Sequence, residues 1–422
     1  MKPLIRLGRN SLWLLAARLG TQALAVVFTV LLARRLGSAD FGRYAFFAAV
    51  IFIGNAVTTF GTDMLLIREI AARDDRSHLP AALMIQLILS GLFIAGVYWL
   101  APLAPSQTPV SVMALQIYSL SLIPLAFFTI FTTALRGFQR MDGYALLNLG
   151  VAVLQVLAAW VFVGQRGDLA GLAGLLVLVQ AAAALLAGVF VTRQIDGFWR
   201  GWRFSPGDLL DTTRAGAPLG LLSILTILYQ KLSLTLVSML GGAALAGWFS
   251  AAQRAVEVAK TGHLVVFTAL YPVMAQARAE AAWEATLQRS WKVLLALAVL
   301  AALGLSLLAE PLVRLLYGAE YLPAVPALRI LAWMLVPFTV NTFLSLSLIA
   351  VNRERTVGWA LASSLLALML LSLWLIPAQG TSGAAVAALG AECVQSAVLL
   401  TQKALAGVAS RQGEPHELSH LS

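Results

Sequence analysis

The chain has 422 residues, of which 60% are hydrophobic and only 11% are charged, whereas an ordinary soluble domain carries about 25% charged residues. This composition excludes an ordinary soluble globular protein. The net charge of +10 is spread over many short segments with no contiguous basic stretch. It therefore argues against nucleic acid as a partner and fits the basic loops of a membrane protein.

Twelve apolar runs follow one another along the chain, and each is close to the ~20 residues that cross a membrane as one helix. The loops between them are short, so no separate soluble domain fits. The expected spans are at about residues 12–33, 45–66, 81–101, 111–134, 145–163, 170–191, 216–240, 248–273, 291–309, 328–350, 357–376 and 383–402. The sequence therefore predicts an all-α membrane protein with about twelve transmembrane helices.

The distribution of Lys and Arg predicts the orientation of these spans. With the N-terminus in the cytoplasm, 19 basic residues fall in cytoplasmic segments and six in outer segments, as the positive-inside rule requires. Both termini are therefore expected in the cytoplasm. The first outer loop is the exception, because Arg34, Arg35 and Arg43 break the rule there. These arginines require contact with lipid headgroups or a functional explanation.

The two halves of the chain share three pairs of features in the same order, with offsets of about 204 to 215 residues. The pairs are Leu36-Gly37-Ser-Ala39 with Leu240-Gly241-Gly-Ala243, each followed by an aromatic residue (Tyr44 and Trp248), Pro124 with Pro337, and Arg140–Leu146 with Arg355–Leu361. An offset of six spans makes both halves enter the membrane from the same side, which gives a pseudo-twofold axis along the membrane normal. We expect two pseudo-symmetric six-helix lobes around a central cavity.

The predicted organisation has four parts. They are a first lobe at 1–191, a cytoplasmic connector at 192–215, a second lobe at 216–403 and a disordered cytoplasmic tail at 404–422. The aromatic and basic connector is typical of a helix that lies on the anionic inner leaflet.

Four cations fall within the predicted spans, where a central charge costs ~2.5 to 3.5 kcal/mol on insertion scales. They are Arg18, Lys231, Arg254 and Lys260. Such residues normally face a bundle interior or a wet cavity, so they are the candidate ligands of an anionic substrate. The alternative for the last two is that, together with Glu257, they form ion pairs along one helix face, because the three are spaced by three residues.

Acidic residues in or near the spans are fewer, and Glu257, Glu392 and Asp63 are the candidates for a coupling or charge-partner role. Glu392 lies in the last span, one turn from Gln395, and either binds a coupling proton or sodium ion or pairs with a neighbouring helix. Polar amides within the spans either line a cavity for sugars or bond between helices.

No catalytic or metal site is expected. The single cysteine, Cys393, excludes a disulfide framework, and the four histidines form no HExxH motif. GxSxG, P-loop and GxGxxG motifs are absent from the sequence, and no outer loop carries a pair of carboxylates. We therefore predict that the protein is not an enzyme and has no cofactor.

Several ordered motifs resemble a known family. They are "LLARRLGSADFGRYAFFAAV", "FGTDMLLIREIA", "ALRGFQRMDGYALLN", "GWFSAAQRAVEVAK" and "FTALYPVMA". Together they are similar, over about residues 10–360, to the oligosaccharide flippases of bacterial O-antigen and exopolysaccharide loci. These flippases belong to the multidrug/oligosaccharidyl-lipid/polysaccharide exporter superfamily. The resemblance implies twelve to fourteen helices in two lobes and alternating access of a lipid-linked glycan.

The resemblance also extends to single residues. Arg18 is similar to an arginine in the first helix of the superfamily's lipid II flippase, and Arg254 to one in its eighth, with Glu257 also following the pattern. Two features differ: the two extra C-terminal helices of that flippase are missing, and Ser233, with Lys231 near it, stands where related flippases often have an acidic residue. The first difference argues against a peptidoglycan precursor as substrate.

The resemblance implies transport of a polyprenyl-diphosphate-linked oligosaccharide across the bacterial inner membrane. The expected partners are the lipid-linked oligosaccharide, the bilayer and a polysaccharide polymerase or ligase, without nucleic acid. Two alternatives remain: a multidrug cation antiporter of the same superfamily, disfavoured by the excess of cations, and a membrane enzyme of glycan assembly, disfavoured by the missing catalytic pairs.

Overall fold

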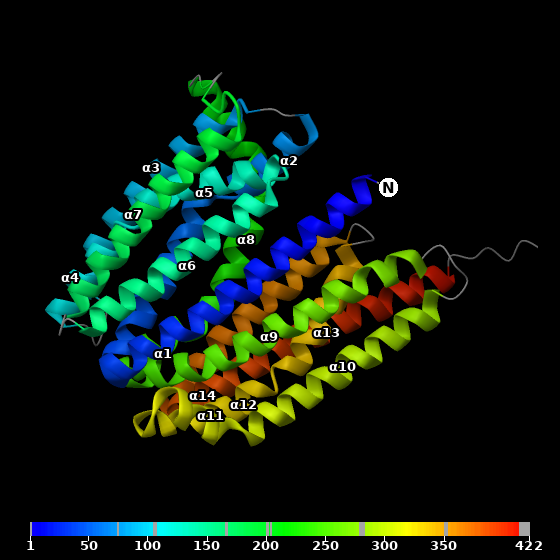
Figure 1. The fold of residues 1–422 in the computed structure, drawn as a ribbon. Coiled ribbons are helices and arrows are strands. Elements are labelled where there is room, and N and C mark those ends of the chain that lie inside the picture. The colour runs from blue at the N-terminus through cyan, green and yellow to red at the C-terminus, as the bar shows by residue number, and fades with distance from the viewer. Residues whose placement is uncertain are drawn as a thin grey trace, which may run out of the picture.

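A computed structural model describes residues 2–73, 76–103, 108–164, 168–199, 202, 205–277, 283–349 and 353–412, and within these ranges the chain forms helices and no strand. Two groups of long helices lie against each other and diverge toward the side that carries the N-terminus (Figure 1). We refer to α1–α7 as the first lobe and to α9–α14 as the second lobe; α8 runs between them.

The elements of the first lobe follow one another with short connections. They are α1 (Lys2–Thr59), α2 (Thr62–Arg73), α3 (His78–Leu100), the 3-10 turn η1 (Ala101–Leu103), α4 (Pro109–Ser119), α5 (Leu122–Gly137), α6 (Met141–Gly164) and α7 (Leu169–Gln194).

The second half of the chain begins with α8 and also consists of helices joined by short connections. Its elements are α8 (Pro206–Gly241), α9 (Ala243–Ala277), α10 (Trp283–Leu307), α11 (Ala309–Tyr317), η2 (Ala319–Ala324), α12 (Val325–Ala332), α13 (Leu335–Ile349) and α14 (Glu354–Gln412).

These helices account for about twelve membrane crossings, as predicted. Eight described segments are long and apolar enough to span, and α10 with α11, bent by 62°, forms a ninth. Two of the eight are 45 and 48 residues long, about twice one crossing, and their helices are broken at Gly37 (φ 72°) and Gly380 (φ 58°). Each therefore contributes two crossings. The remaining one is assigned to α9, whose 35 residues are long enough to cross, although α9 is not among the described segments that are apolar enough by composition.

The backbone repeats the same features in both lobes. Gly37 (φ 72°, ψ 175°) and Gly242 (φ 87°, ψ 177°) adopt nearly the same left-handed conformation immediately before a long helix segment. The sequence comparison paired Gly37 with Gly241, so the structural equivalence lies one residue further along. Because Gly241 and Gly242 are adjacent, the sequence alone did not show which of them corresponds to Gly37. Only Gly242 has the positive φ that favours glycine.

The fourth span of each lobe is interrupted at the same place relative to a proline. The break between α4 and α5 begins at Leu120, four residues before Pro124, and the break between α12 and α13 begins at Trp333, four residues before Pro337. A proline ring clashes with the carbonyl four residues earlier and removes one hydrogen bond. The paired prolines therefore explain both interruptions.

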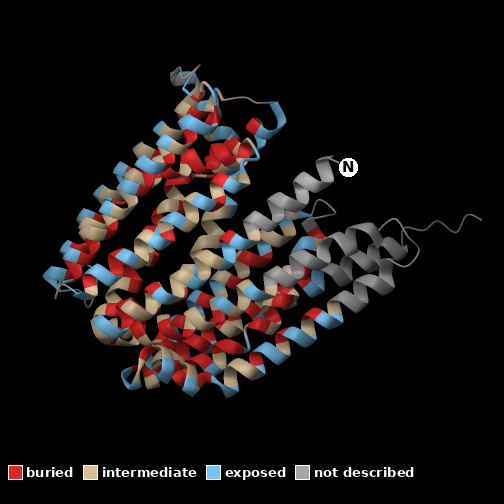
Figure 2. Ribbon diagram, in the orientation of Figure 1, coloured by how far each residue is buried: buried red, intermediate tan, exposed pale blue. Residues whose placement is uncertain are grey.

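The surface is that of a protein in lipid. Buried residues gather where helices face one another, and exposed residues follow the outward faces (Figure 2). Many of the exposed side chains are large and apolar, and Trp99, Trp160 and Trp359 are largely exposed near helix ends. Tryptophans at such positions are typical of the membrane–water interface. The protein is thus a multi-pass membrane protein.

The connector differs from the expected surface helix. Ile195–Trp199 form turns, Phe198 is buried, and its ring lies 6.0 Å from that of Phe131. An aromatic cluster that also includes Trp202 holds this segment against the first lobe. Phe198 and Trp202 therefore pack on protein, where composition had suggested lipid. At the other end of the chain, α14 runs to Gln412 through the start of the predicted tail, and 413–422 lie outside the described residues.

One helix is shared between the lobes. The first turns of α8 contact the first lobe, where a Cβ on Gly220 would lie 2.6 Å from the carbonyl oxygen of Phe60, and where Thr212 Oγ1 is 2.9 Å from His78 Nδ1. The later part of α8 packs on the second lobe, with Gly241 beside Ile376 of α14. Pro218 lies within the part that contacts the first lobe, between Thr212 and Gly220.

Candidate functional site: a charged cavity between the lobes

A cavity of about 420 Å³ lies between the two lobes. Its walls come from α1, α4, α5, α6 and α7 on one side and from α8 and α9 on the other, and they combine aromatic, amide and hydroxyl side chains with three charged ones. The polar and charged residues that line it are Thr29, Tyr44, Asn55, Tyr118, Ser121, Gln155, Gln180, Lys231, Ser250, Gln253, Arg254 and Glu257.

Three charged side chains meet in this cavity. Glu257 lies between two cations: its Oε2 is 2.9 Å from Arg254 Nη1 and its Oε1 is 3.6 Å from Lys231 Nζ. The Lys231 Nζ atom also lies 4.9 Å from the centroid of the Phe52 ring, within the range of a cation–π contact. Among the described lining residues, two cations thus face one carboxylate, and the cavity carries an excess positive charge.

Several polar atoms in the cavity wall have no hydrogen-bond partner among the described residues. They include Arg254 Nε, Gln180 Nε2 and Ser121 Oγ. Buried polar groups in proteins are nearly always paired, and the two nitrogen atoms can only donate. The wall is therefore suited to a ligand that offers oxygen acceptors.

The amides of the spans divide between the two roles that the sequence left open. Asn55, Gln155 and Gln180 line the cavity. Gln86, by contrast, donates from Nε2 to Thr62 Oγ1 at 2.9 Å, and Asn341 donates to Glu392. Periodicity alone could not separate these groups because both face the interior of the bundle.

Arg18 does not line the cavity. It is exposed on α1, seven residues before Ala25, which does line it. Seven residues are nearly two helical turns, so Arg18 lies on the same face as Ala25 and about 10 Å closer to the N-terminal end. The structure thus brings Lys231 and Arg254 together in the cavity. Arg18 lies outside the cavity, on the same face of α1 as Ala25.

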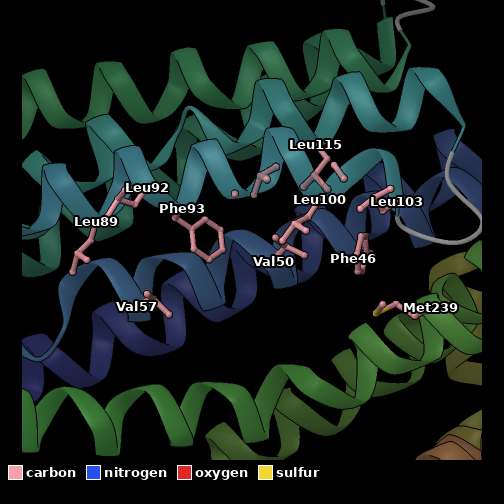
Figure 3. A pocket seen from close by; sticks show the side chains of 13 residues that line it. Phe46, Val50, Val57, Leu89, Leu92, Phe93, Leu100, Leu103, Leu115 and Met239 are labelled. Atoms are coloured by element: carbon pink, nitrogen blue, oxygen red, sulfur yellow. The ribbon is translucent and has the colours of Figure 1, made fainter.

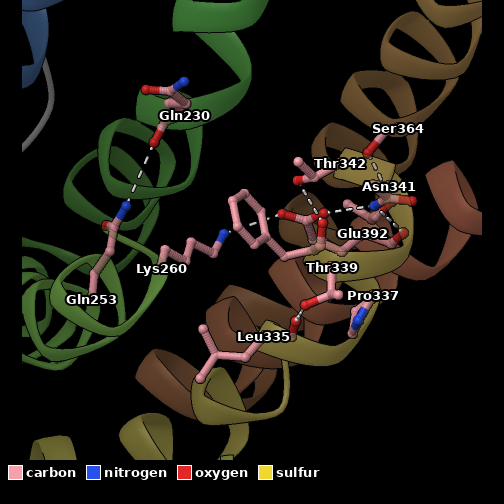
Figure 4. A network of polar contacts seen from close by, with 12 residues as sticks. Gln230, Gln253, Lys260, Leu335, Pro337, Thr339, Asn341, Thr342, Ser364 and Glu392 are labelled. Atoms are coloured by element: carbon pink, nitrogen blue, oxygen red, sulfur yellow. Dashed lines mark hydrogen bonds and ion pairs between the residues drawn. The ribbon is translucent and has the colours of Figure 1, made fainter. Parts of the chain in front are cut away.

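Lys260 belongs to a separate network on the far side of α9. Its Nζ is 3.2 Å from Oε1 of Glu392 in α14, and Asn341 Nδ2 donates to Glu392 Oε2 at 2.8 Å (Figure 4). Lys260 Nζ also lies 4.6 Å from the Phe338 ring centroid. Glu392 is 3% exposed, so its charge is compensated within the protein.

The proposed row of ion pairs along α9 is therefore only half present. Arg254 and Glu257 pair as expected, but Lys260 does not join them. Six residues along an α-helix correspond to a rotation of about 600°, so Lys260 points roughly 120° away from Arg254. The remaining acidic candidate, Asp63, lies in the first turn of α2, where a negative charge interacts favourably with the helix dipole.

The lobes meet closely at the predicted outer end of the cavity. A Cβ on Gly42 would lie 1.8 Å from the carbonyl oxygen of Ala243, and a Cβ on Gly247 would lie 2.0 Å from that of Ser38. These contacts are reciprocal between α1 and α9. Only glycine at both positions allows the two backbones to approach so closely.

A polar latch accompanies this contact, and sequence reasoning missed its acidic member. The backbone N–H of Ser38 donates to Glu320 Oε1 at 2.6 Å, and the Tyr321 hydroxyl donates to the Ala33 carbonyl at 3.0 Å. Arg34 donates from Nε to the Leu316 carbonyl at 2.8 Å, at the end of α11. We use the term outer latch for Arg34, Ser38, Glu320 and Tyr321.

The outer latch explains one of the arginines that violate the positive-inside rule. Arg34 caps the carbonyl end of a helix, where a cation is favourable, and Arg43 pairs with Asp40 at 2.5 Å. The anomalous charge of this loop was the available signal for a functional contact. Glu320, which accepts the hydrogen bond from the Ser38 N–H, is 282 residues away from Ser38 along the chain. No local sequence pattern connects the two residues.

Comparison with known proteins gives a family and a fold. The family described as "Polysaccharide biosynthesis protein" matches residues 7–278, which is more than half of the chain. No curated protein matches.

Among solved structures, the lipid II flippase MurJ in an inward closed conformation is similar with a TM-score of 0.75 and 14% identity, covering 92% of this chain and 86% of that one. An inward-facing multidrug resistance MATE family transporter of the MOP superfamily has a TM-score of 0.71 and 17% identity, with 93% and 96% covered. A MOP superfamily transporter from Pyrococcus furiosus, described as having a binding pocket of reverse polarity, has a TM-score of 0.66 and 16% identity, with 95% of each chain covered. These likenesses establish the two-lobed fold of this superfamily.

Proposed function

Because the chain belongs to the family of polysaccharide biosynthesis proteins, we propose that it flips a polyprenyl-diphosphate-linked oligosaccharide across the bacterial inner membrane by alternating access. The protein performs no covalent chemistry and has both termini in the cytoplasm. The observation that carries the proposal is the cavity between the lobes in which Lys231 and Arg254 share Glu257.

The diphosphate is the part of the substrate that this cavity fits best. Lys231 and Arg254 both lie within 3.6 Å of one carboxylate, so both reach a single small anion. A phosphate oxygen ~4 Å from a cation gains ~4 kcal/mol at an effective dielectric constant of about 20. Two such contacts offset much of the hydration that the headgroup loses.

The oligosaccharide occupies the polar remainder of the cavity. Asn55, Gln155 and Gln180 supply donors and acceptors, and Tyr44 and Tyr118 supply ring faces. Amide and aromatic groups of this kind bind hydroxyl-rich ligands without a dedicated charge. Arg18, on the same stripe of α1, provides the first contact for the diphosphate at the cytoplasmic mouth.

The membrane potential supplies the driving force. Moving one negative charge outward across a bilayer that is negative inside is downhill by ~2.3 kcal/mol per 100 mV. The return of an unloaded, net positive cavity is downhill as well. A coupling ion is then not required, and Glu257, Glu392 and Asp63 act as charge partners within the protein.

The two alternatives fit the cavity less well. A multidrug cation antiporter would bind organic cations, which two positive side chains against one carboxylate repel. An enzyme of glycan assembly requires a pair of acid and base groups beside the substrate, and Glu257 is the one carboxylate among the described lining residues. A polysaccharide polymerase or ligase acts on the glycan after release.

The proposal is tested in proteoliposomes with a fluorescent polyprenyl-diphosphate disaccharide. We expect Lys231→Gln and Arg254→Gln each to lower the rate of flipping at least tenfold. Arg314→Gln is the matched control, because Arg314 pairs with Glu310 at the surface away from the cavity, and it should leave the rate unchanged. Equal rates in all variants, or competition by an organic cation such as ethidium, would contradict the proposal.

A cellular test separates the three functions. Deletion of the gene should abolish surface polysaccharide while undecaprenyl-linked intermediates accumulate on the cytoplasmic side. Increased drug sensitivity with normal polysaccharide would favour the antiporter. Altered glycan linkage with normal levels of intermediates would favour the enzyme.

A further inference from the structure

A second hollow lies beside the charged cavity and has the opposite character. It is an apolar groove of about 640 Å³, and all 13 side chains or glycines that line it are apolar (Figure 3). It is formed by α1, α3, η1, α4 and α8, and its lining includes Phe46, Val50, Leu92, Phe93, Gly96 and Met239.

The groove and the cavity are separated by a single helix. On α1, Phe46 and Val50 face the groove, whereas Ala45, Ala49 and Phe52 face the cavity. The two hollows thus lie on adjacent faces of α1. An entirely apolar hollow therefore lies on the other side of this helix from the charged cavity.

The groove also lies where the two lobes meet. Twelve of its lining residues belong to the first lobe, and Met239 reaches it from α8 (Figure 3). On the same helix, Lys231 lines the cavity, eight residues and therefore about 12 Å before Met239. Lys231 and the groove residue Met239 are thus about two turns apart on the same helix.

The length of the groove suits a hydrocarbon chain. Its wall extends along α3 from Leu89 to Leu100 and on to Leu103. Leu100 lies 11 positions after Leu89, a rise of about 17 Å, which is more than half of the ~30 Å hydrocarbon core. Trp99 beside this end is largely exposed, as is typical at the membrane interface. The groove therefore runs along α3 toward the end of this helix that is predicted to be outer.

We propose that this groove holds the polyprenyl chain of the substrate while the diphosphate is bound at Lys231 and Arg254. This inference rests on the proposed function and deepens it. Because lipid tails are as apolar as the groove, its occupation adds little affinity over the surrounding bilayer. Its effect is positional: the chain is fixed at the seam between α1, α3 and α8, so the headgroup enters the cavity in one orientation and the closing lobes do not trap the tail.

Two glycines of α3 provide a matched pair of variants. An added Cβ meets no atom within 4 Å at either Gly91 or Gly96, so both positions accept a larger side chain. Gly96 lines the groove and Gly91 does not. Gly96→Trp fills the groove, and Gly91→Trp places the same bulk on the same helix outside it.

The experiment is photo-crosslinking of the full-length protein in proteoliposomes. The two probes are a diazirine-bearing polyprenyl diphosphate and a diazirine-bearing phosphatidylethanolamine, and labelled peptides are mapped by mass spectrometry. We expect the polyprenyl probe to label the α1 and α3 walls of the groove in the wild-type protein, and excess unlabelled polyprenyl diphosphate to lower this labelling at least fivefold. Gly96→Trp should lower labelling and flipping by a similar factor, and Gly91→Trp should change neither.

The outcomes separate this inference from the proposed function. If the groove is labelled equally by both probes and the competitor has no effect, bulk lipid occupies it and the inference is wrong, even when wild-type flipping is normal. Protection of the thiol of Ser250→Cys by inorganic pyrophosphate, in a Cys393→Ser background, reports on the headgroup site alone. Normal protection without specific groove labelling overturns the tail site only; no protection and no flipping overturn the proposed function.

Discussion

Lys260 and Glu392 form an ion pair between α9 and α14, with Nζ and Oε1 3.2 Å apart. The carboxylate is almost fully buried, and Asn341 donates to its second oxygen. Removing one partner of a buried pair leaves an uncompensated charge, which typically costs 3–5 kcal/mol. The pair therefore fixes how the eighth and twelfth crossings pack.

We predict that Lys260→Met lowers the melting temperature of the purified protein, because Glu392 is then left without its cation. The double variant Lys260→Met with Glu392→Gln should recover most of the loss, since replacing both partners removes the buried charge. Thermal unfolding in detergent measures both effects. A double variant that is less stable than Lys260→Met would show that Glu392 has another role in the fold.

A second prediction concerns the contact between Gly42 and Gly247. Gly247→Ala places a Cβ 2.0 Å from the Ser38 carbonyl oxygen, so α1 and α9 must separate; overpacking of this kind typically costs 1–3 kcal/mol. We expect the outer ends of the lobes to move apart, as measured by distances between spin labels on the two lobes. Gly262→Ala is the control, because a Cβ there meets no atom within 4 Å. An unchanged distance in Gly247→Ala would show that this contact does not hold the lobes closed.

The outer latch gives a third prediction. Glu320→Ala removes the acceptor of the Ser38 N–H, which should populate the outward-open state. A cysteine at Ser250, in the cavity wall, should then react several-fold faster with a membrane-impermeant thiol reagent added from outside. The background carries Cys393→Ser, which removes the single native cysteine. Glu310→Ala is the control, because Glu310 pairs with Arg314 of its own helix. An equal rate in both variants would refute a gating role for Glu320.

The fourth prediction concerns the charge balance of the cavity. Glu257→Gln removes the carboxylate that pairs with both Lys231 and Arg254, so both cations become available to an anion. We expect inorganic pyrophosphate to bind about tenfold more tightly and substrate release to slow. Isothermal titration and flipping rates measure the two effects. Weaker pyrophosphate binding in Glu257→Gln would mean that Glu257 positions the cations when the ligand is bound.

The fifth prediction concerns the energy source. A potassium diffusion potential, negative inside, should accelerate outward flipping of a diphosphate-linked probe, because the headgroup charge moves down the potential. Sodium and proton gradients of equal size should have little effect at zero potential. Flipping that responds to a sodium or proton gradient alone would contradict potential-driven transport and would direct attention to Glu392 and Glu257.

The helices of this fold were predictable because the sequence signal for a membrane span is strong. Apolar runs gave about twelve crossings, and repeated prolines and glycines gave the two lobes. Helix ends were less accurate, since the chain remains helical beyond the lipid core: α1 continues to Gly37 through a segment expected to be a loop. Hydropathy marks the stretch of chain that lies in lipid, whereas a helix ends where its backbone hydrogen bonds end.

The site was predictable in part. Intramembrane charge identified Lys231 and Arg254, and the structure places them in one cavity. The same criterion selected Lys260, which faces the interior of the second lobe, because a wet cavity and a buried ion pair both keep a charge out of lipid. Glu320 escaped notice since its role depends on contacts made across the lobe interface.

The sharing of α8 has a consequence for how the polypeptide can be divided. Its opening turns rest on Phe60 and His78, and its closing turns rest on α14, so scission at the connector would not yield two self-contained pieces. The carboxy-terminal fragment would keep α8, whose first turns contact the first lobe in the amino-terminal fragment. Fragments produced separately should therefore reassociate through this helix.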